Sequence, residues 1–203
     1  MIAIIDYRAG NLRSVERALT HLGIACTITS DPDTILSAER VIFPGVGAAG
    51  KAMETVRSGG LDRIILEVVG QGTPFLGICL GTQIIFDASE EDSASCLGII
   101  PGTVRRFPET GEKIPHMGWN TIERIRSHPL LEGVDRDAWF YFVHSYYPDP
   151  ALDDHVTART SYCLEFASAV SRANVFATQF HPEKSGEPGL RILENFSRWD
   201  GKP

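Results

Sequence analysis

The first half of the chain alternates short apolar strands with helix-like segments, and this rhythm limits the possible folds more than any other feature. Strand-like runs are expected at residues 2–6, 24–29, 40–43 and 74–78. Helix-like stretches run up to residue 22, from about 51 to 69, and from 80 to 88. Because strands that alternate with helices form βαβ units, we expect a parallel sheet flanked by helices. In sheets of this kind, ligands bind outside the carboxyl ends of the strands.

The second half consists of strand-like segments separated by Gly, Pro and Asp, and it closes with a helix over about residues 188–199. The strand-like runs lie at residues 98–105, 119–125, 139–146, 155–159, 164–171 and 175–179. We therefore predict an α/β fold with an open, mostly parallel sheet flanked by helices and an additional antiparallel β region. A chain of 203 residues buries about 70% of its unfolded surface, enough for a single domain over residues 1–203.

Composition and charge exclude several classes of protein. The chain carries 19 Lys and Arg against 26 Asp and Glu and has no basic stripe, which argues against nucleic-acid binding. No apolar run reaches the length that spans a membrane, and the first residues lack the pattern of a secretory signal. The four cysteines form no CxxC pair, so we expect a cytoplasmic protein without a disulfide framework, metal or other cofactor.

One of these cysteines, Cys79, lies where an apolar strand turns into a helix. Glycines stand two residues before and two residues after it, at Gly77 and Gly81. Such a sharp turn presents a nucleophile above the sheet, and the helix N–H groups favour the reactive thiolate. The N–H of Leu80 is then a donor for a developing oxyanion. The alternative is an inert, buried cysteine, the interpretation that we keep for the cysteines at positions 26, 96 and 163.

A second strand ends in His181-Pro182-Glu183. A thiol nucleophile needs an imidazole to hold the thiolate and to protonate the leaving group, and a carboxylate fixes the tautomer of that imidazole. Pro182 keeps the backbone of His181 extended, which suits a positioned base. The alternative is a surface loop with an incidental His and Glu. Among the other histidines, His144 is expected to be a buried, hydrogen-bonded ring.

The segment Phe43-Pro-Gly-Val-Gly-Ala48 lacks the spacing of a nucleotide-binding loop. It is better interpreted as a tight turn that brings backbone N–H groups close to a substrate. Val46 and Gly47 would then provide the second oxyanion donor. A plain structural turn is the alternative.

Two segments resemble the class I, or triad, glutamine amidotransferases: GICLGTQ at residues 77–83 and QFHPE at residues 179–183. Three more are similar to one group of that family, the glutaminase subunits of imidazole glycerol phosphate synthase: residues 6–15, 115–120 and 181–185. The resemblance extends from about residue 2 to residue 196. The chain departs from the family pattern at Arg8, Ala49 and Thr82, where we expect glycine, an aromatic residue and methionine.

The resemblance implies that Cys79, His181 and Glu183 hydrolyse L-glutamine through a thioester. It implies that glutamine is held by Gln83, Ser145 and Tyr146. It also implies a heterodimer with a (β/α)8-barrel cyclase, a separate chain that uses the ammonia in histidine biosynthesis.

The same resemblance places a set of residues from three segments at the partner interface, around the mouth of the site. These residues are Tyr7, Asn11, Met117, Trp119 and Lys184. For Trp119, packing in the core of the antiparallel region is the alternative.

Three other functions compete with this one. The chain could be the glutaminase subunit of another triad amidotransferase, of the anthranilate or guanylate synthase type. It could be a stand-alone cysteine hydrolase, which would need no exposed Met117, Trp119 and Lys184. It could also be a non-catalytic binding module, although that function predicts loss of at least one of the three catalytic residues.

Overall fold

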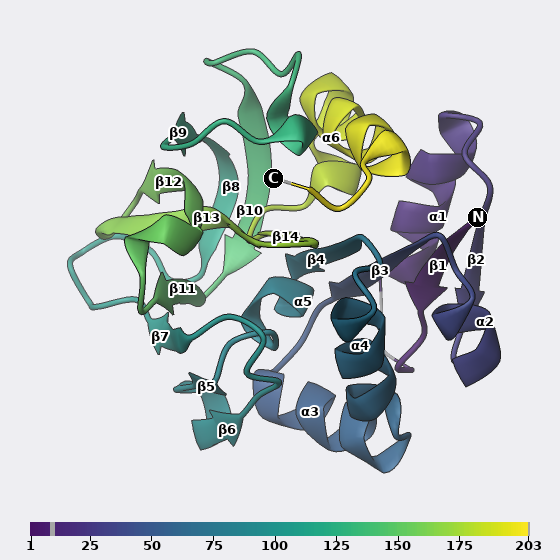
Figure 1. Cartoon of the computed structure of the whole chain (residues 1–203). Helices are drawn as coiled ribbons and strands as arrows, with labels where there is room; N and C mark the ends of the chain where they lie inside the picture. The colour runs from purple at the N-terminus through teal and green to yellow at the C-terminus, as the bar shows by residue number, and fades with distance from the viewer. Residues whose placement is uncertain (9–10, 203) are drawn as a thin grey trace.

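The computed structural model describes residues 1–8 and 11–202 and has a long central sheet (Figure 1). In spatial order its strands are β2 (Cys26–Thr29), β1 (Ile2–Ile5), β3 (Arg40–Gly45), β4 (Phe75–Cys79), β14 (Val175–Thr178), β13 (Glu165–Arg172), β12 (Val156–Ser161) and β9 (Glu123–Arg124). The first five are parallel, and the last three continue the sheet in antiparallel pairing. The predicted open, mostly parallel sheet is therefore confirmed.

Helices cover both faces of this sheet because its strands are apolar on both sides. On β1, Ala3 and Ile5 belong to one core cluster, whereas Ile2 and Ile4 belong to the other. The first cluster lies under α2 (Pro32–Leu36), α3 (Ala49–Ser58) and α4 (Leu61–Gly70). The second lies under α1 (Leu12–His21) and α6 (Gly186–Arg198), which Figure 1 shows on the side of the sheet away from α3 and α4.

Two helices differ from the sequence prediction. The single helix expected over residues 51–69 is divided into α3 and α4 because Gly60 adopts the left-handed conformation, with a φ of 70°. The helix expected over residues 80–88 ends early, as α5 (Leu80–Gln83). The carbonyl groups of Ile84, Ile85 and Phe86 accept hydrogen bonds from the N–H groups of residues 97–100, so the helix does not continue.

The predicted antiparallel region is present beside the main sheet. A two-stranded ribbon pairs β8 (His116–Thr121) with β10 (Trp139–His144). A second small sheet contains β11 (Tyr146–Pro150), β7 (Gly102–Arg106), β5 (Ala88–Ser89) and β6 (Ala94–Ser95). The strand expected over residues 139–146 is thus broken at Ser145, where the chain passes from the ribbon into the other sheet.

Short 3₁₀ turns complete the fold: η1 (Glu91–Ser93), η2 (Pro129–Leu131), η3 (Asp153–His155) and η4 (Pro182–Lys184). No helix within residues 1–8 and 11–202 is long and apolar enough to cross a membrane.

The buried ring of His128 makes stability depend on pH. Its Nδ1 accepts a hydrogen bond from the N–H of Leu130 at 3.2 Å, and its ring packs on Phe176 and Trp199. Burial lowers the pKa of His128 from 6.5 to about 4, so the folded state resists a proton that the unfolded state binds. Its contribution to stability is complete above pH 6.5 and is lost as the pH falls toward 4. We expect protonation of this side chain alone to lower the free energy of unfolding by about 2 kcal/mol between pH 7 and pH 5.

The variant His128→Asn isolates this effect because asparagine keeps an acceptor at the start of η2 and cannot titrate. Urea unfolding at pH 7 and pH 5 should show a smaller loss of stability for the variant than for the unmodified chain. Equal losses would mean that His128 does not resist protonation.

Candidate active site

Cys79 stands at the end of β4, at the turn into α5. Its backbone has φ 54° and ψ −102°, a conformation that non-glycine residues rarely adopt and that is typical of strained functional turns. Neighbouring backbone approaches this turn too closely for side chains at the flanking glycines. A Cβ on Gly81 would lie 1.9 Å from the carbonyl oxygen of Phe43, and one on Gly77 would lie 2.9 Å from that of Gly81.

Thr82, one of the departures from the family pattern, ties this turn to the strand that leads to His181. Its Oγ1 donates a hydrogen bond to the carbonyl oxygen of Thr178, the last residue of β14. The side chain is fully buried, so the hydroxyl needs this partner. Methionine at this position would leave the carbonyl without that donor.

The side chains of His181 and Glu183 meet through the 3₁₀ turn η4, a bend that the sequence alone did not reveal. Nδ1 of His181 lies 2.7 Å from Oε1 of Glu183, and both side chains are fully buried. Because a carboxylate can only accept, Nδ1 carries a proton that it donates, and Nε2 remains for the nucleophile. The backbone N–H of His181 donates to the carbonyl oxygen of Tyr141 at 2.9 Å, which fixes the start of the turn.

Burial of His181 lowers its pKa, but the neighbouring Cys79 sulfur and the contact with Glu183 raise it more. The net effect is a pKa well above the ordinary 6.5. Nε2 is buried and forms no hydrogen bond of regular geometry with the described residues, so the Cys79 contact is electrostatic more than directional. The surroundings therefore favour the protonated form of the His181 imidazole.

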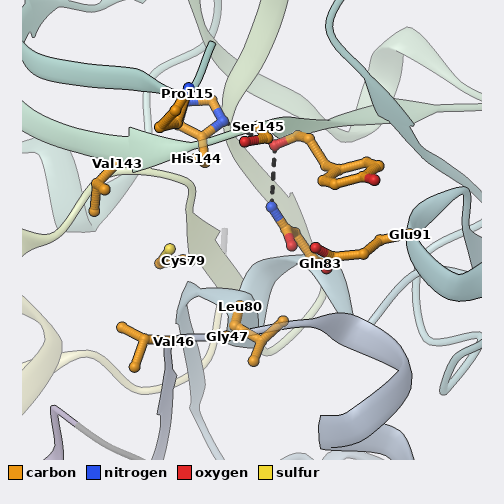
Figure 2. A pocket seen from close by; sticks show the side chains of 11 residues that line it. Val46, Gly47, Cys79, Leu80, Gln83, Glu91, Pro115, Val143, His144 and Ser145 are labelled. Carbon is orange, nitrogen blue, oxygen red and sulfur yellow. Dashed lines mark hydrogen bonds between the residues drawn. The ribbon is translucent and has the colours of Figure 1, made fainter.

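A cavity of about 300 Å³ opens beside Cys79, at the carboxyl ends of the parallel strands. Figure 2 shows the Cys79 sulfur between Val143 and His144 on one side and Val46, Gly47 and Leu80 on the other. Its lining brings together the residues predicted for the oxyanion hole and for glutamine: Val46, Gly47, Leu80, Gln83, Ser145 and Tyr146. Its volume is at the small end for ligand pockets and suits a single amino acid.

The side chain of Gln83 closes one end of this cavity. Its Nε2 donates to the carbonyl oxygen of Tyr146 at 3.0 Å, the bond drawn in Figure 2. Ser145, where β10 gives way to β11, lies next to that carbonyl. These residues therefore line the same wall although they are far apart in the sequence.

His144, predicted as a buried and hydrogen-bonded ring, belongs to the same wall. Its Nδ1 lies 2.8 Å from the carbonyl oxygen of Tyr146, and its Nε2 lies 3.1 Å from Nδ1 of His116. Burial lowers the pKa of His144 to about 3 and that of His116 to about 4, so both rings are neutral. The prediction for His144 is confirmed.

Glu91 is a cavity residue that sequence reasoning missed. Its Oε2 accepts a hydrogen bond from the N–H of Ala49 at 2.7 Å, at the start of α3, and its carboxylate lines the cavity. Burial, together with the neighbouring Asp92, raises the pKa of Glu91 more than the Ala49 N–H lowers it. In the sequence it lies within an acidic run, Glu-Glu-Asp, which is typical of a solvated loop and gives no sign of this position.

The outer face of the β8–β10 ribbon is rich in exposed large side chains. Met117 is 63% exposed and Trp119 is 53% exposed, so packing of Trp119 in the core, the alternative interpretation, is wrong. Lys184 is exposed as well, with its Nζ 5.8 Å from the ring centroid of Tyr141, which in turn contacts Trp119 edge to face. We call Met117, Trp119, Tyr141 and Lys184 the ribbon patch.

The prediction of an interface role for Tyr7 is wrong for its side chain. Tyr7 is only 2% exposed and stacks on Phe43, with ring centroids 4.8 Å apart. Its pKa is raised to about 12, mainly by burial. The N–H of Val46 lowers the pKa in part, and nearby Cys79 raises it. Tyr7 thus packs behind the Val46–Gly47 turn instead of facing a partner.

Asn11 makes a contact that the sequence did not predict. Its Nδ2 donates to Oε1 of Glu183, the oxygen that also contacts His181. The residue is partly exposed, so its interface role stays a prediction. Its backbone, with φ 77°, adopts the left-handed conformation that asparagine tolerates better than most residues.

Comparisons with known proteins agree with this geometry. Residues 3–198 match the family model for class-I glutamine amidotransferases. The chain is 52% identical to the imidazole glycerol phosphate synthase subunit HisH of Desulfovibrio desulfuricans, covering 97% of this chain and 93% of that protein. It is 50% identical to the HisH subunit of Dehalococcoides mccartyi, covering 97% and 96%.

Solved structures share the fold at lower identity. A glutamine amidotransferase crystal structure superposes with a TM-score of 0.76 at 20% identity, covering 97% of this chain and 99% of that one. The PurLQS structure from Thermotoga maritima gives a TM-score of 0.77 at 18% identity, covering 97% of each chain. The chain therefore belongs to the class-I glutamine amidotransferase family, among the imidazole glycerol phosphate synthase subunits called HisH.

Proposed function

We propose that this chain hydrolyses glutamine to glutamate and ammonia at Cys79 and passes the ammonia to a cyclase subunit in histidine biosynthesis. The observation that carries the proposal is the alignment of Glu183, His181 and Cys79 behind a cavity sized for an amino acid. The names of its HisH relatives support the pathway and the existence of a second subunit.

In the proposed reaction, the Cys79 thiolate attacks the side-chain amide carbon of glutamine, and a C–S bond forms. The carbonyl oxygen becomes an oxyanion, and the N–H of Leu80 and an amide of the Val46–Gly47 turn donate to it. Nε2 of His181 then gives its proton to the leaving nitrogen, the C–N bond breaks, and ammonia departs from a glutamyl thioester. His181 next takes a proton from water, whose oxygen attacks the thioester. The C–S bond then breaks, glutamate leaves, and the Cys79 thiolate is restored opposite the protonated His181.

The cavity offers groups that match the amino-acid end of glutamine. Gln83, Ser145 and Tyr146 line it and are proposed to hold that end. Glu91 is the one carboxylate among the lining residues that the structure describes, and it suits the α-ammonium group of the substrate by charge. Pairing with that cation would offset the burial that disfavours the ionised carboxylate.

A separate partner follows from the chemistry of the product. Ammonia released into neutral water takes up a proton and is no longer a nucleophile, so it must reach the acceptor without passing through solvent. We propose that the chain forms a cytoplasmic heterodimer with a (β/α)8-barrel cyclase. The two subunits together would act as a lyase. The ribbon patch is the proposed docking surface, since exposed Trp and Met beside an active site are typical of interfaces.

The test of the proposal is ammonia release from glutamine by the purified chain, with and without its cyclase. We expect hydrolysis to rise when the cyclase is added and the ammonia to appear in the cyclase product. A hydrolysis rate that the cyclase leaves unchanged would favour a stand-alone cysteine hydrolase.

Trp119→Ala tests the docking surface. Truncating a central aromatic residue of an interface costs about 2 kcal/mol or more, so we expect the complex to weaken about 30-fold and ammonia to leak into solvent. Titration calorimetry and the ratio of free ammonia to cyclase product measure the two effects. Leu66→Ala is the matched control because Leu66 is an exposed apolar side chain on α4. A Trp119→Ala chain that binds its partner and transfers all its ammonia would exclude the ribbon patch as the interface.

A further inference from the structure

The mechanism above makes no use of Gln179, a polar side chain close to the nucleophile. It lies just after β14, two residues before His181, and is fully buried. Its Nε2 lies 3.7 Å from the sulfur of Cys79, and its Oε1 lies 3.1 Å from Nε2 of Gln83. Burying an amide is costly unless its donors and acceptors are paired, and the two partners here are the nucleophile and a substrate-binding residue.

One fixed acceptor determines the orientation of both amides. The carbonyl oxygen of Tyr146 can only accept, so the Gln83 atom that lies 3.0 Å from it is the amino group. The same amino group approaches the side chain of Gln179, so the atom that it meets there is the oxygen. The amino group of Gln179 is therefore turned toward the Cys79 sulfur, as a donor.

We infer that Gln179 is a positioning residue that donates a side-chain N–H to the Cys79 sulfur and so favours its thiolate form. The inference rests on the glutaminase function proposed above. A thiolate is a much better acceptor than a neutral thiol, so the bond stabilises the ionised state more and shifts the ionisation of Cys79 toward it. The donor adds to the effect of His181, because α5 has only four residues and provides little helix dipole.

The contact also joins the nucleophile to the substrate-binding wall. An unbroken row of hydrogen bonds runs from the Tyr146 carbonyl through Gln83 and Gln179 to the sulfur of Cys79. Because Oε1 of Gln179 accepts from Gln83, the Gln179 amide is prevented from rotating and presenting its oxygen to the thiolate. Gln83 thus fixes which end of Gln179 meets the sulfur.

Several ionisable groups surround the same sulfur and must be separated from the effect of Gln179. His181 faces it with Glu183 behind, and the Tyr7 hydroxyl lies close enough to interact with its charge. Glu91 and His144 line the cavity into which the sulfur points. None of these groups changes when Gln179 alone is substituted, so a shift in the ionisation of Cys79 would report the loss of the N–H donor.

The experiment measures the rate at which iodoacetamide alkylates Cys79 in the full-length chain as a function of pH, read from the mass of the Cys79 peptide. The midpoint of that profile is the pKa of the thiol. Gln179→Met keeps the length of the side chain and removes the donor, and we expect the midpoint to rise by about one unit, a tenfold loss of thiolate below the midpoint. Gln179→Glu keeps the shape and adds a negative charge, so its midpoint should rise further.

Thr178→Val is the matched control. It removes a neighbouring buried hydroxyl, which donates to the carbonyl oxygen of Phe180 at 3.0 Å, and the midpoint should stay unchanged. Circular dichroism checks the folding of each variant, and if Gln179→Met does not fold, the isosteric Gln179→Glu decides.

Midpoints of both Gln179 variants equal to that of the unmodified chain would overturn the inference and leave Gln179 a packing residue. A different result would overturn the proposed function instead: an unmodified chain that releases no ammonia from glutamine when its cyclase is present, although its Cys79 is alkylated. The two failures are therefore distinguishable.

Discussion

Cys79→Ser is expected to lower glutamine hydrolysis by about 10⁴- to 10⁶-fold, the loss typical when a catalytic unit loses its nucleophile. Serine has nearly the same size, so the strained turn between β4 and α5 should persist. Its hydroxyl has a far higher pKa than a thiol and would not be ionised opposite His181. Ammonia release measures the loss, and the unfolding free energy in urea shows that the fold is retained.

The other three cysteines provide controls for this prediction. Burial raises the pKa of Cys96 to about 11 and also raises that of Cys26, so neither is a reactive thiolate. Alanine at positions 26, 96 or 163 should leave hydrolysis unchanged, and an electrophilic glutamine analogue should label Cys79 alone. Substantial activity in Cys79→Ser would show that the nucleophile is another residue.

Substitutions of His181 and Glu183 should lower the rate of glutamine hydrolysis by different amounts. His181→Ala removes the proton carrier and should cost about as much as Cys79→Ser, because members of a catalytic unit act non-additively. Glu183→Gln should cost less, since an amide oxygen still accepts from Nδ1 of His181 and only the charge is lost. The comparison uses kcat for glutamine hydrolysis, and a larger loss in Glu183→Gln would mean that the two roles are exchanged.

Gly81→Ala is expected to destabilise the chain by about 3 kcal/mol or more, although it adds only one methyl group. The new Cβ would lie 1.9 Å from the carbonyl oxygen of Phe43, which is backbone and cannot rotate away. Strand β3 would have to move, and it leads directly into the Val46–Gly47 turn that lines the cavity. The free energy of unfolding in urea and the rate of ammonia release should therefore both decrease.

Gly70→Ala is the matched control for this substitution. Gly70 is the last residue of α4, and a Cβ there would meet no atom within 4 Å. Alanine should be neutral or stabilise the chain by about 0.4–1 kcal/mol, because it reduces the freedom of the unfolded state. If Gly81→Ala were as stable as Gly70→Ala, the close approach of β3 to α5 would not exist in solution.

The features that could be predicted from the sequence are those set by local pattern. The alternation of apolar strands and helices is enough to indicate a parallel sheet, and the glycines around Cys79 indicate the turn that carries it. Both depend on short-range sterics that single segments express on their own. The same reasoning failed where a distant segment competes for hydrogen bonds. The carbonyl groups of residues 84–86 accept from the N–H groups of residues 97–100, so the helix expected up to residue 88 ends early.

The parts of the site that escaped prediction are those in which one segment meets another. The family resemblance places Tyr7 at the partner surface, but its side chain is buried and stacks on Phe43 of β3. No local sequence pattern indicates the contacts of Glu91, Asn11 and Gln179, because each contacts a residue far away in the sequence. Side-chain contacts of this kind follow from the tertiary fold and not from spacing.

The order of strands in the central sheet also bears on when the enzyme can become active during synthesis. Strand β14 lies between β4 and β13, so the middle of the sheet stays open until residues 175–178 have been made. Cys79 is translated about a hundred residues before His181, and contacts between such distant segments form late in folding. A nascent chain therefore exposes its cysteine without the proposed base, and the proposed pair of Cys79 and His181 comes together only when the sheet is complete.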